Sequence, residues 1–407
     1  MSTPERAGVQ IWATATGGGH WRASQALAQA LRLRSRGMVS VAIDDPLRLP
    51  IGGGARALAR SYGTLVRTSP SLWGLVFRGF SRPAAVTAMH HYLWGQLGPA
   101  IDRRTRERGA AVVVVCHPLL GQTVSRAARS GDGNPRLVTV MTDLVGGHPS
   151  WLAARPDALI TATPEATRWS VERGLAPHLV WETGLPIDPD LAAGPLDLAR
   201  RRDLRLALGL EERPPVILVG GGAEGAGPIG RLLRWVDRGR PQLQLVVACG
   251  HNRRLQQRLR RKPLSVPTLV LGYQRSLTPW IRAADVYLGK AGPSTLAEAA
   301  AAGLAILVAG ELPGQESENG RALARHGAAV EVRGRRALLR LLARLCRPED
   351  PLLPELRRGA RAWSRPSAAW DAAGVVLSLL PSPSPDWVSP PPQGSAAAGG
   401  PFPRPGG

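Results

Sequence analysis

Short runs of apolar residues alternate with longer amphipathic stretches along most of the chain. The runs are continuous and rich in Val, Ile and Leu, which is typical of strands buried on both faces of a sheet. Strands that alternate with helices in this way form parallel sheets. The runs fall into two sets and therefore predict two doubly wound, Rossmann-like α/β domains. They lie at residues 9–15, 39–44, 111–117, 137–143, 158–163 and 178–184, and at residues 216–221, 243–250, 268–273, 286–290 and 305–310.

The predicted domains meet at residues 184–197, where Gly, Pro and Asp are dense. We therefore expect an N-terminal domain over residues 1–190 and a C-terminal domain over residues 191–346. A helical stretch follows at residues 347–380, and we expect it to pack back on the N-terminal domain. Residues 381–407 are rich in Pro, Gly and Ser, which predicts a disordered tail.

Charge narrows the range of partners. The 407 residues include 52 Lys+Arg and 30 Asp+Glu, a formal net charge of +22 that is almost all arginine. Such an excess suits nucleic acid, anionic lipid or phosphorylated substrates, although a GC-rich coding bias produces the same composition. The N-terminus lacks the pattern of a signal peptide, and no uncharged apolar run reaches the roughly 18–20 residues of a membrane span. We expect a protein that is soluble or lies on a membrane surface.

The cysteine spacing gives information on the redox compartment of the protein and on possible metal sites. Cys116, Cys249 and Cys346 are far apart in the sequence, which argues against a disulfide framework or a metal site and fits a reducing cytosol. The sequence Asp188-Pro189-Asp190 has the form of a D-x-D metal motif, but it lies in the predicted linker. We therefore expect no metal.

A glycine turn joins the first apolar run to a helical pattern in "IWATATGGGHWRASQALAQAL" (residues 11–31). Its glycines, Gly17, Gly18 and Gly19, leave backbone N–H groups open to an anion at a helix N-terminus. Their spacing does not match the G-x-G-x-x-G dinucleotide fingerprint. His20 opens the helix, where the dipole lowers its pKa and keeps the imidazole neutral, so that it is a candidate general base. The alternative is a tight turn with a solvent-exposed histidine.

A second glycine turn, which includes Gly221 and Gly222, follows the first apolar run of the second half in "VILVGGGAEGAGPIGRLL". Ligands of open α/β sheets bind at the carboxyl ends of the strands. The two glycine loops therefore face each other if the domains pack with these ends together.

The third motif is "GKAGPSTLAEAAAAGLAILVAGELPGQESEN" (residues 289–319). Ser294 and Thr295 can cap a helix that starts near Leu296 and offers N–H groups to an anion. Glu298 is one turn further, where it can accept hydrogen bonds from ribose hydroxyls. A polar loop follows that suits a hydroxyl-rich ligand; the alternative is a capped helix and an ordinary polar turn. The loop residues are Gln315, Glu316 and Asn319.

Residues 55–97 combine aromatic side chains with arginines. Trp73, Phe77 and Phe80 are the aromatic residues that we single out. This combination suits a membrane interface with anionic lipid, and an amphipathic core helix is an equally weighted alternative.

Six ordered motifs carry a resemblance to a known family: "TGGGHWRASQAL", "VMTDLVGGHPSW", "ETGLPIDP", "LVGGGAEGAGPI", "KAGPSTLAEA" and "LPGQESEN". The chain resembles the GT-B glycosyltransferases of family 28, in particular the monogalactosyldiacylglycerol synthases and bacterial diacylglycerol glucosyltransferases. It is more distantly similar to the GlcNAc transferase of peptidoglycan lipid-intermediate synthesis. The resemblance implies a GT-B fold, with two Rossmann-like domains facing across a cleft.

The resemblance also implies roles for individual residues. Gly18, Gly19 and His20 match the loop that approaches the donor phosphates and the acceptor. Asp143 matches the T-D of the family, and His148 and Trp151 match its acceptor-side H-P-x-W element. In the second half, the diphosphate loop is matched by Gly221 and Gly222, the ribose carboxylate by Glu298, and the sugar-reading group by Gln315, Glu316 and Asn319. The loop at residues 272–281 is a looser version of the uracil-side loop, and residues 317–318 are Ser-Glu where relatives often carry Lys.

The function implied is an inverting, metal-independent transfer of galactose or glucose from a UDP-sugar to diacylglycerol. The base is His20, with Asp143 as the alternative base or as its orienting partner. Other possibilities are transfer of GlcNAc or another sugar to a polyprenyl-type lipid, or a non-catalytic basic protein that binds membrane or nucleic acid. We expect UDP-hexose, diacylglycerol and anionic lipids as partners, no cofactor and no nucleic acid. The expected location is the inner face of the plasma membrane, as a peripheral cytoplasmic protein.

Overall fold

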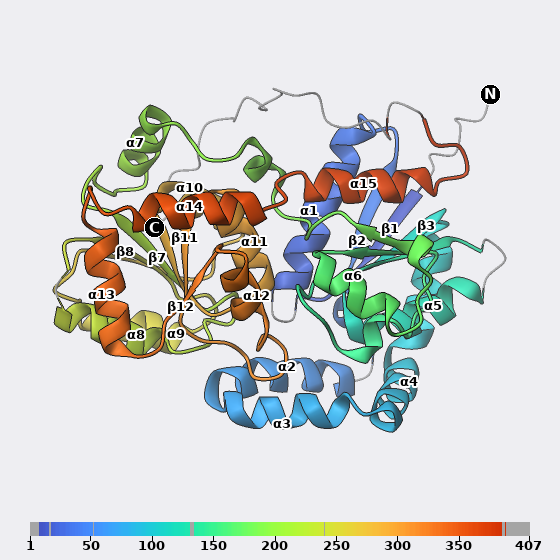
Figure 1. Ribbon diagram of the computed structural model, residues 1–407. Coiled ribbons are helices and arrows are strands. Elements are labelled where there is room, and N and C mark those ends of the chain that lie inside the picture. Colours follow the sequence, from blue (N-terminus) through green and yellow to red (C-terminus); the bar gives the residue numbers. More distant parts are fainter. Residues whose placement is uncertain are drawn as a thin grey trace. The chain divides into compact units, whose positions relative to one another are not determined.

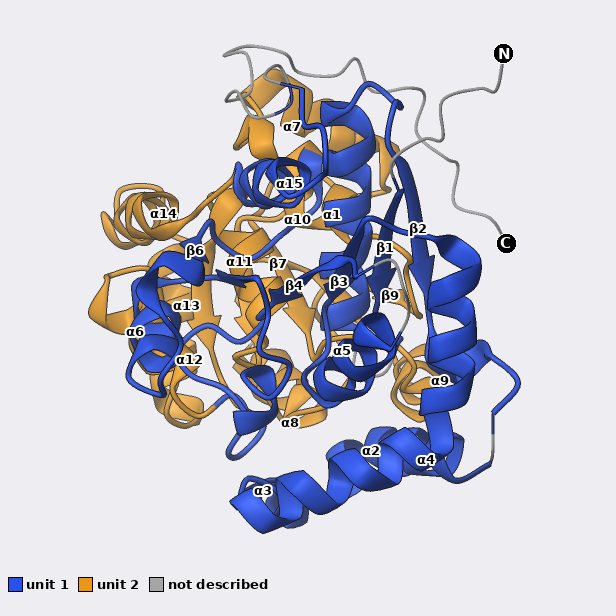
Figure 2. Cartoon of the chain, turned by 90° about the vertical axis from the view of Figure 1, so that its right-hand side faces the viewer, with its two compact units in different colours: residues 1–189, 312–316, 367–390 blue, residues 190–311, 317–366, 391–407 orange. Residues whose placement is uncertain are grey.

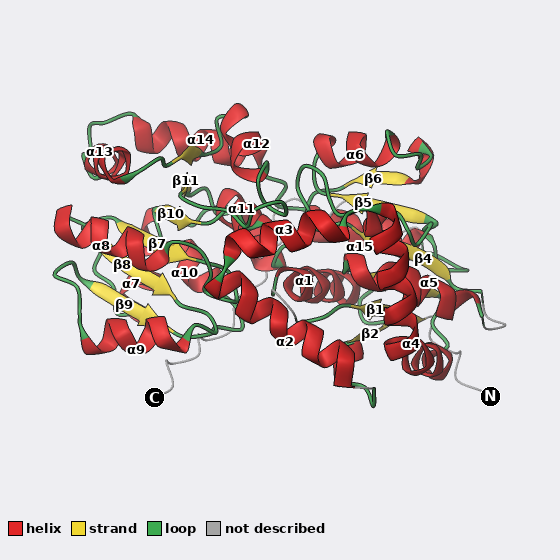
Figure 3. Ribbon diagram, turned by 90° about the horizontal axis from the view of Figure 1, so that it is seen from below, coloured by secondary structure: helices red, strands yellow, loops and turns green. Residues whose placement is uncertain are grey.

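The structure is a computed structural model that describes residues 8–384 except 16–17, 52, 131–133 and 240, together with Trp387 (Figure 1). By their contacts the residues form two compact units (Figure 2). Unit 1 contains the described residues up to Pro189, the segment Leu312–Glu316, and those from Ser367 to Trp387. Unit 2 contains Asp190–Glu311 and Ser317–Pro366. Each unit has its own parallel sheet with helices on both faces (Figure 3).

Unit 1 is a six-stranded parallel sheet in the order β2-β1-β3-β4-β5-β6. Its strands are β1 (Gly8–Trp12), β2 (Ser40–Asp44), β3 (Val112–Val115), β4 (Arg136–Val140), β5 (Ala158–Thr161) and β6 (Val180–Glu182). Its helices are α1 (Gly19–Arg34), α2 (Gly53–Thr68), α3 (Pro70–Phe80), α4 (Pro83–Arg108), α5 (Gly121–Arg129), α6 (Pro164–Val171) and α15 (Ala368–Ser378).

The valine run of β3 shows why unit 1 needs continuous apolar strands. Val112 and Val114 belong to the core under α1 and α15, whereas Val113 and Val115 belong to the core under α4 and α5. Successive side chains of a strand point to opposite faces, so a sheet covered on both sides requires apolar residues at every position.

Unit 2 is also a six-stranded parallel sheet, but in the order β12-β11-β10-β7-β8-β9. Its strands are β7 (Val216–Gly220), β8 (Gln244–Ala248), β9 (Thr268–Leu271), β10 (Val286–Gly289), β11 (Ala305–Val308) and β12 (Val330–Glu331). Its helices are α7 (Leu198–Ala207), α8 (Ile229–Gly239), α9 (Arg253–Arg261), α10 (Thr278–Ala283), α11 (Pro293–Ala301), α12 (Asn319–Arg325), α13 (Arg335–Leu345) and α14 (Leu352–Trp363).

The predicted fold class, two doubly wound α/β domains, is confirmed. Each of the eleven predicted runs coincides with a strand to within a few residues, and β12, which has only two residues, is an addition. The strand orders place a switch point between β1 and β3 in unit 1 and between β7 and β10 in unit 2. Both predicted glycine turns follow the first strand of their sheet, at these switch points, where doubly wound sheets bind ligands.

The C-terminal stretch at residues 347–380 is divided between the two units. Leu352 and Leu356 of α14 are buried in the core of unit 2, so that α14 belongs to unit 2. Only α15 joins unit 1, where Val376 and Leu377 pack into the core beside α1. Of the tail expected at residues 381–407, all but 381–384 and Trp387 lies outside the described residues.

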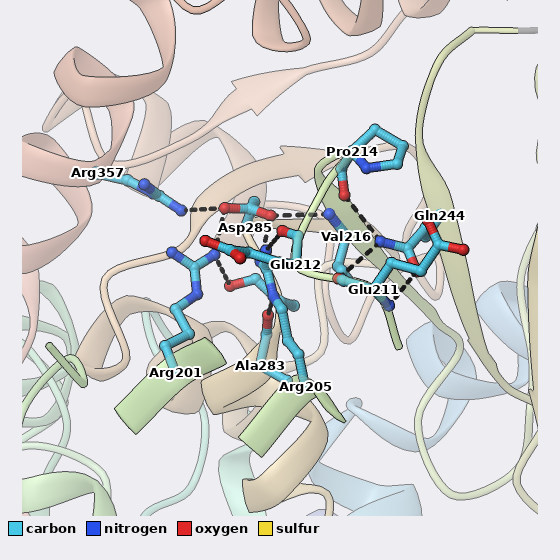
Figure 4. Close-up of polar contacts among 11 residues, drawn as sticks. Arg201, Arg205, Glu211, Glu212, Pro214, Val216, Gln244, Ala283, Asp285 and Arg357 are labelled. Carbon is cyan, nitrogen blue, oxygen red and sulfur yellow. Dashed lines mark hydrogen bonds and ion pairs between the residues drawn. The ribbon is translucent and has the colours of Figure 1, made fainter. Parts of the chain in front are cut away.

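One carboxylate fixes two helices to the amino-terminal edge of the sheet in unit 2 (Figure 4). Asp285, directly before β10, accepts a hydrogen bond of 2.7 Å from the backbone N–H of Val216 at the start of β7. It also pairs with Arg201 and Arg205 of α7 and with Arg357 of α14. Burial alone raises the pKa of Asp285, but the three guanidinium groups outweigh it and the pKa is lowered.

Candidate functional site

The glycine turn of unit 1 ends directly at the helix that carries His20. Gly18 is the N-cap of α1 and has φ = +77°, a left-handed conformation that glycine adopts without strain. Gly19 is the first residue of α1, and His20 is the second. Gly17 lies outside the described residues. The histidine therefore stands at a helix N-terminus at the switch point of the sheet.

His20 is surrounded by groups from the ends of two neighbouring strands. Its Nδ1 lies 2.7 Å from the hydroxyl oxygen of Thr142, two residues beyond β4. Its ring centroid is 4.6 Å from that of His117, two residues beyond β3, in an edge-to-face arrangement. Trp151 lies on another side, with the ring centroids 5.9 Å apart. Desolvation in this setting lowers the pKa of His20 to about 4, so the imidazole is neutral at pH 7.

Sequence reasoning missed Thr142 and His117. His117 is held by its own loop, because its Nδ1 accepts a hydrogen bond of 3.3 Å from the backbone N–H of Leu119. Burial, and secondarily the repulsion from a protonated His20, lowers its pKa well below the usual value. A neutral ring that accepts at Nδ1 carries its proton on Nε2. The signal that could have identified both residues is their place two positions after a strand of the sheet.

Among the described residues, no hydrogen bond joins Asp143 to His20. Its Oδ2 accepts a hydrogen bond of 2.6 Å from Nε1 of Trp151, whose ring packs near His20. Burial raises the pKa of Asp143 to about 7, against the opposing effect of the Trp151 bond; the nearby Glu316 raises it further. The carboxyl group therefore holds the indole whose ring lies near His20.

His148 connects the H-P-x-W element to α3. Its Nε2 lies 2.9 Å from the carbonyl oxygen of Phe80, so that Nε2–H donates to that carbonyl. Its Nδ1 accepts from the backbone N–H of Ser150 at 3.3 Å, which caps the short helix η3 (Pro149–Trp151). Trp151 itself is fully buried. Both residues expected on the acceptor side are thus engaged in internal hydrogen bonds.

The three aromatic residues selected on α3 differ in exposure. The ring of Trp73 packs against Tyr62 at 4.9 Å, and the ring of Phe77 packs against His148 at 5.5 Å. Among the three selected aromatic residues, only Phe80 is exposed, at 42%. The apolar residues exposed beside it are Leu72 (50%) and Leu75 (59%). The aromatic content alone did not predict which residues of α3 lie on its packed side and which lie on its exposed side.

In unit 2, Lys290 is a candidate site residue that was not selected from the sequence. It follows β10, next to the glycine turn after β7, because Gly220 and Gly289 are register partners. A Cβ atom at Gly222, which has φ = +70°, would lie 3.2 Å from Cε of Lys290 and 3.7 Å from its Nζ. Glycine therefore leaves room for an ammonium group over a backbone turn, an arrangement suited to a phosphate.

The neighbouring Gly221 is required by the loop itself, since a Cβ atom there would lie 2.0 Å from the carbonyl oxygen of Ala226.

Helix α11, which the sequence predicted to start near Leu296, begins earlier, at Pro293 with Gly292 as its N-cap. Proline is favoured at the first helical position, and Ser294 and Thr295 therefore follow the start rather than cap it. Both side chains are buried, as is that of Glu298.

The residues of the polar loop have different surroundings. Glu316 accepts a hydrogen bond of 2.9 Å from the backbone N–H of Leu312 and so closes the loop on itself. Asn319 donates to the carbonyl oxygen of Ala291 at 3.0 Å. Gln315, in contrast, has a buried Oε1 without a hydrogen-bond partner among the described residues. Of the three, Gln315 is the one whose side-chain oxygen the described residues leave unpaired.

An exposed aromatic pair lies after β8 and β9 in unit 2. His251 and Tyr273 are stacked with their centroids 4.1 Å apart and their planes at 12°. Tyr273 is 48% exposed and belongs to the loop expected on the uracil side. Neither residue was selected from the sequence. A flat, exposed ring at the ligand-binding edge of a sheet can stack on a nucleobase.

Two negative findings concern the described residues only. They contain no helix long and apolar enough to span a membrane. They also contain no group of three or more His, Cys, Asp or Glu side chains that could hold a metal ion.

The fold defines the class of protein. The structure resembles MurG of Acinetobacter baumannii, with a TM-score of 0.58, 19% identity, and coverage of 91% of this chain and 99% of that one. It also resembles HepE of Anabaena, solved in complex with UDP and glucose, with a TM-score of 0.56, 13% identity, and coverage of 91% and 100%. The fold is that of the GT-B glycosyltransferases.

Sequence comparison adds the family. Residues 20–187 match the model for monogalactosyldiacylglycerol synthase, and residues 216–348 match the glycosyltransferase family 28 C-terminal domain. The chain is a family 28 glycosyltransferase that is similar to the monogalactosyldiacylglycerol synthases, which confirms the resemblance found in the sequence. Relatives include the probable monogalactosyldiacylglycerol synthase 2 of Oryza sativa subsp. japonica, 28% identical over 92% of this chain and 81% of that protein. Monogalactosyldiacylglycerol synthase 2 of Arabidopsis thaliana is 26% identical over 91% and 80%.

Proposed function

We propose that this glycosyltransferase moves a hexose, galactose or glucose, from a UDP-sugar to the free hydroxyl group of diacylglycerol with inversion at the anomeric carbon. The family supports transfer of a sugar to a lipid, and the names of the relatives favour diacylglycerol as the acceptor. Bound UDP in a neighbour of the same fold favours a UDP-sugar donor.

The observation that carries this proposal is a neutral imidazole at the switch point of unit 1. If Nδ1–H of His20 donates to the Thr142 oxygen at 2.7 Å, the lone pair on Nε2 is free for the proton of the acceptor hydroxyl. The acceptor oxygen then attacks the anomeric carbon as the bond to the diphosphate breaks. His20 keeps some access to solvent, whereas the carboxyl of Asp143 is buried and bonded to Trp151. His20 is therefore the base, and Asp143 is a positioning residue.

Unit 2 binds the donor in this proposal. Lys290 and the backbone around Gly222 hold the diphosphate and stabilise the charge that develops as it leaves. The N–H groups at the start of α11, at Ser294 and Thr295, add to this, so the reaction needs no metal. Tyr273 stacks on the uracil. The remaining assignments are Glu298 of unit 2 to the ribose hydroxyls and Gln315, which unit 1 carries, to the sugar hydroxyls.

Attachment to the membrane follows from the nature of the acceptor. Diacylglycerol lies in a bilayer, and Leu72, Leu75 and Phe80 present exposed apolar side chains on α3. We place these residues in the headgroup layer of an anionic membrane, with nearby arginines on lipid phosphates. The location we propose is the inner face of the plasma membrane.

The first experiment identifies the reaction. Purified protein is incubated with vesicles that contain diacylglycerol and with UDP-galactose, UDP-glucose or UDP-GlcNAc, with and without a metal chelator. We expect a β-linked hexosyl diacylglycerol from a UDP-α-hexose, formed equally well with the chelator. Transfer only of GlcNAc, or only to a polyprenyl-type lipid, contradicts the proposed substrates.

The second experiment separates the two candidate bases by pH. A base must be deprotonated, so kcat/KM falls as the pH decreases through the pKa of that group in the free enzyme. With His20 as the base, activity persists down to about pH 4. With Asp143 as the base, activity already falls below about pH 7. An acid limb near pH 7 in the parent, together with loss of turnover in Asp143→Asn, assigns the base to Asp143.

A further inference from the structure

Helix α9 of unit 2 exposes positive charge that nothing in its surroundings neutralises. Six of the ten residues from Arg253 to Lys262 are basic, and none is acidic. All six are exposed, and none has an ion-pair partner in the described part of the chain. Leu255 and Leu259 anchor the opposite side of the helix in the core. We call these six residues the α9 patch; they are Arg253, Arg254, Arg258, Arg260, Arg261 and Lys262.

Helix α7 of the same unit shows that the lack of partners is not general. It carries four arginines, and each one faces a carboxylate (Figure 4 shows two of them). Arg200 pairs with Asp197 and Arg202 with Glu212, both at 3.5 Å. A coding bias toward arginine explains why both helices are basic, but it does not explain why only α9 lacks acidic neighbours.

The α9 patch is also unfavourable for the helix that carries it. Arg253 and Arg254 occupy the first turn, where the helix dipole disfavours positive charge, and no acidic residue stands there. Arg254 and Arg258 are four residues apart, and like charges at this spacing destabilise a helix. An external polyanion removes both penalties, because it supplies the missing negative charge.

A hollow beside the patch, lined by both apolar and polar residues, favours one kind of polyanion. A cavity of about 390 Å³ lies between the end of α9 and the edge strand β9. Leu264, Val266 and Val270 contribute apolar side chains to its lining, and Arg260 is part of it. A nucleic-acid duplex presents phosphates and keeps its bases stacked inside, whereas a phospholipid offers both an anionic headgroup and an apolar chain.

We propose that the α9 patch is a docking surface for an anionic phospholipid bilayer, and that it attaches the donor-binding unit to the membrane independently of α3. Exposed arginines on α8 and α13, which pack on the same face of the sheet as α9, extend this positive surface. The proposal rests on the proposed function, since a lipid acceptor is what makes a membrane the partner. It adds a second attachment, in the other unit.

The test is binding to vesicles that contain no diacylglycerol, so that docking is measured without the acceptor. Vesicles of phosphatidylcholine with and without phosphatidylglycerol are the probes, and the full-length protein is sedimented with them. The test variant replaces Arg254, Arg258 and Arg261, which lie on one stripe of α9, with glutamine. At about 5-fold for each cation near an anionic surface, we expect its partition coefficient to fall about 100-fold. Binding of the parent should weaken with added salt.

Two further variants control for net charge and for folding. Arg36→Gln, Arg103→Gln and Arg168→Gln together remove the same charge from exposed positions of unit 1, and we expect a change of only a few-fold. Replacing the three α9 arginines with lysine keeps the charge and should keep the binding. Unchanged UDP affinity in all variants shows that unit 2 is folded.

Three results overturn the proposal. One is equal loss of vesicle binding in the glutamine variants of α9 and of unit 1, which leaves net charge as the cause. Another is unchanged binding in the α9 variant. The third is stronger dependence on α9 for binding a DNA duplex than for binding phosphatidylglycerol vesicles, which makes the partner a nucleic acid. Transferase activity on detergent-dispersed diacylglycerol reports on the proposed function separately, because it does not require docking.

Discussion

The two units share one plan, a parallel sheet with a glycine turn after its first strand, but they place different chemistry at that turn. Unit 1 surrounds the turn with titratable groups whose uncharged forms are favoured by burial. Burial lowers the pKa values of His20 and His117 and raises that of Asp143, and each of these shifts favours the uncharged form. Unit 2 places the ammonium group of Lys290 over the glycine backbone instead.

The difference teaches how one architecture supports two tasks. A proton acceptor must be neutral and close to its substrate, and desolvation provides a neutral imidazole without any counter-ion. A site for a diphosphate needs fixed positive charge and backbone N–H groups, and in the proposed function Lys290 and the glycine loop supply them. The strand orders differ as well, so the common feature is the switch point rather than the topology.

The largest expected effect tests the task of unit 1. We expect His20→Ala to lower kcat by about 10²–10⁴, the usual contribution of a positioned base, and to leave UDP-sugar affinity within a few-fold. Steady-state kinetics with calorimetric titration of the donor measures both quantities. His91→Ala is the control, because His91 is exposed and bonded to the Thr87 carbonyl of its own helix. A loss of donor affinity as large as the loss of kcat would contradict the division between the units.

The next effect tests the task of unit 2. Lys290→Gln removes the cation beside Gly222, and the loss of a charge-assisted hydrogen bond should weaken UDP binding by about 10–100-fold. Uridine, which has no phosphate, should bind the variant and the parent alike. Lys262→Gln, at the exposed end of α9, serves as the control. Equal weakening for UDP and uridine would mean that the substitution damages the fold of the site and not its charge.

A smaller effect tests the acceptor side at the membrane. We expect serine at Leu72, Leu75 and Phe80 to reduce vesicle binding roughly 10-fold, since these partly exposed side chains lose apolar burial in the headgroup layer. UDP affinity should not change. The matched control places serine at Leu33, Met38 and Leu198, which are at least as exposed as Leu72. The same loss in the control would remove any special role for α3.

The smallest expected effect tests whether Tyr273 of unit 2 stacks on the nucleobase. Tyr273→Ala should weaken binding of UDP and of uridine to the same extent, about 2–10-fold, because stacking contributes about 0.5–1.5 kcal/mol beyond area burial. Tyr92→Ala, a tyrosine of similar exposure (45%) in unit 1, should have no effect on either ligand. Weakened UDP binding with normal uridine binding would place Tyr273 near the phosphates instead of the base.

Much of the molecule was determined locally and could be predicted from the sequence. A strand covered on both faces must be apolar at every position, so runs such as Val112–Val115 revealed the parallel sheets. A left-handed turn favours glycine, so Gly18 and Gly222 marked the loops at the switch points. Ordered motifs then identified the family, and with it the chemistry.

What the sequence alone could not decide is which side chains meet. Thr142 and His117 reach His20 from strands far along the chain, and only the order β1-β3-β4 makes them neighbours. The same holds for Lys290 and Gly222, which depend on the pairing of β10 with β7. The side of α3 on which each side chain lies was equally unpredictable. Nothing in the composition of this helix shows that Phe77 packs inward on His148 while Leu75 faces solvent. Periodicity and turn chemistry act over a few residues, whereas contacts, burial and pKa values arise from the packing of distant segments, and the tertiary structure settled them.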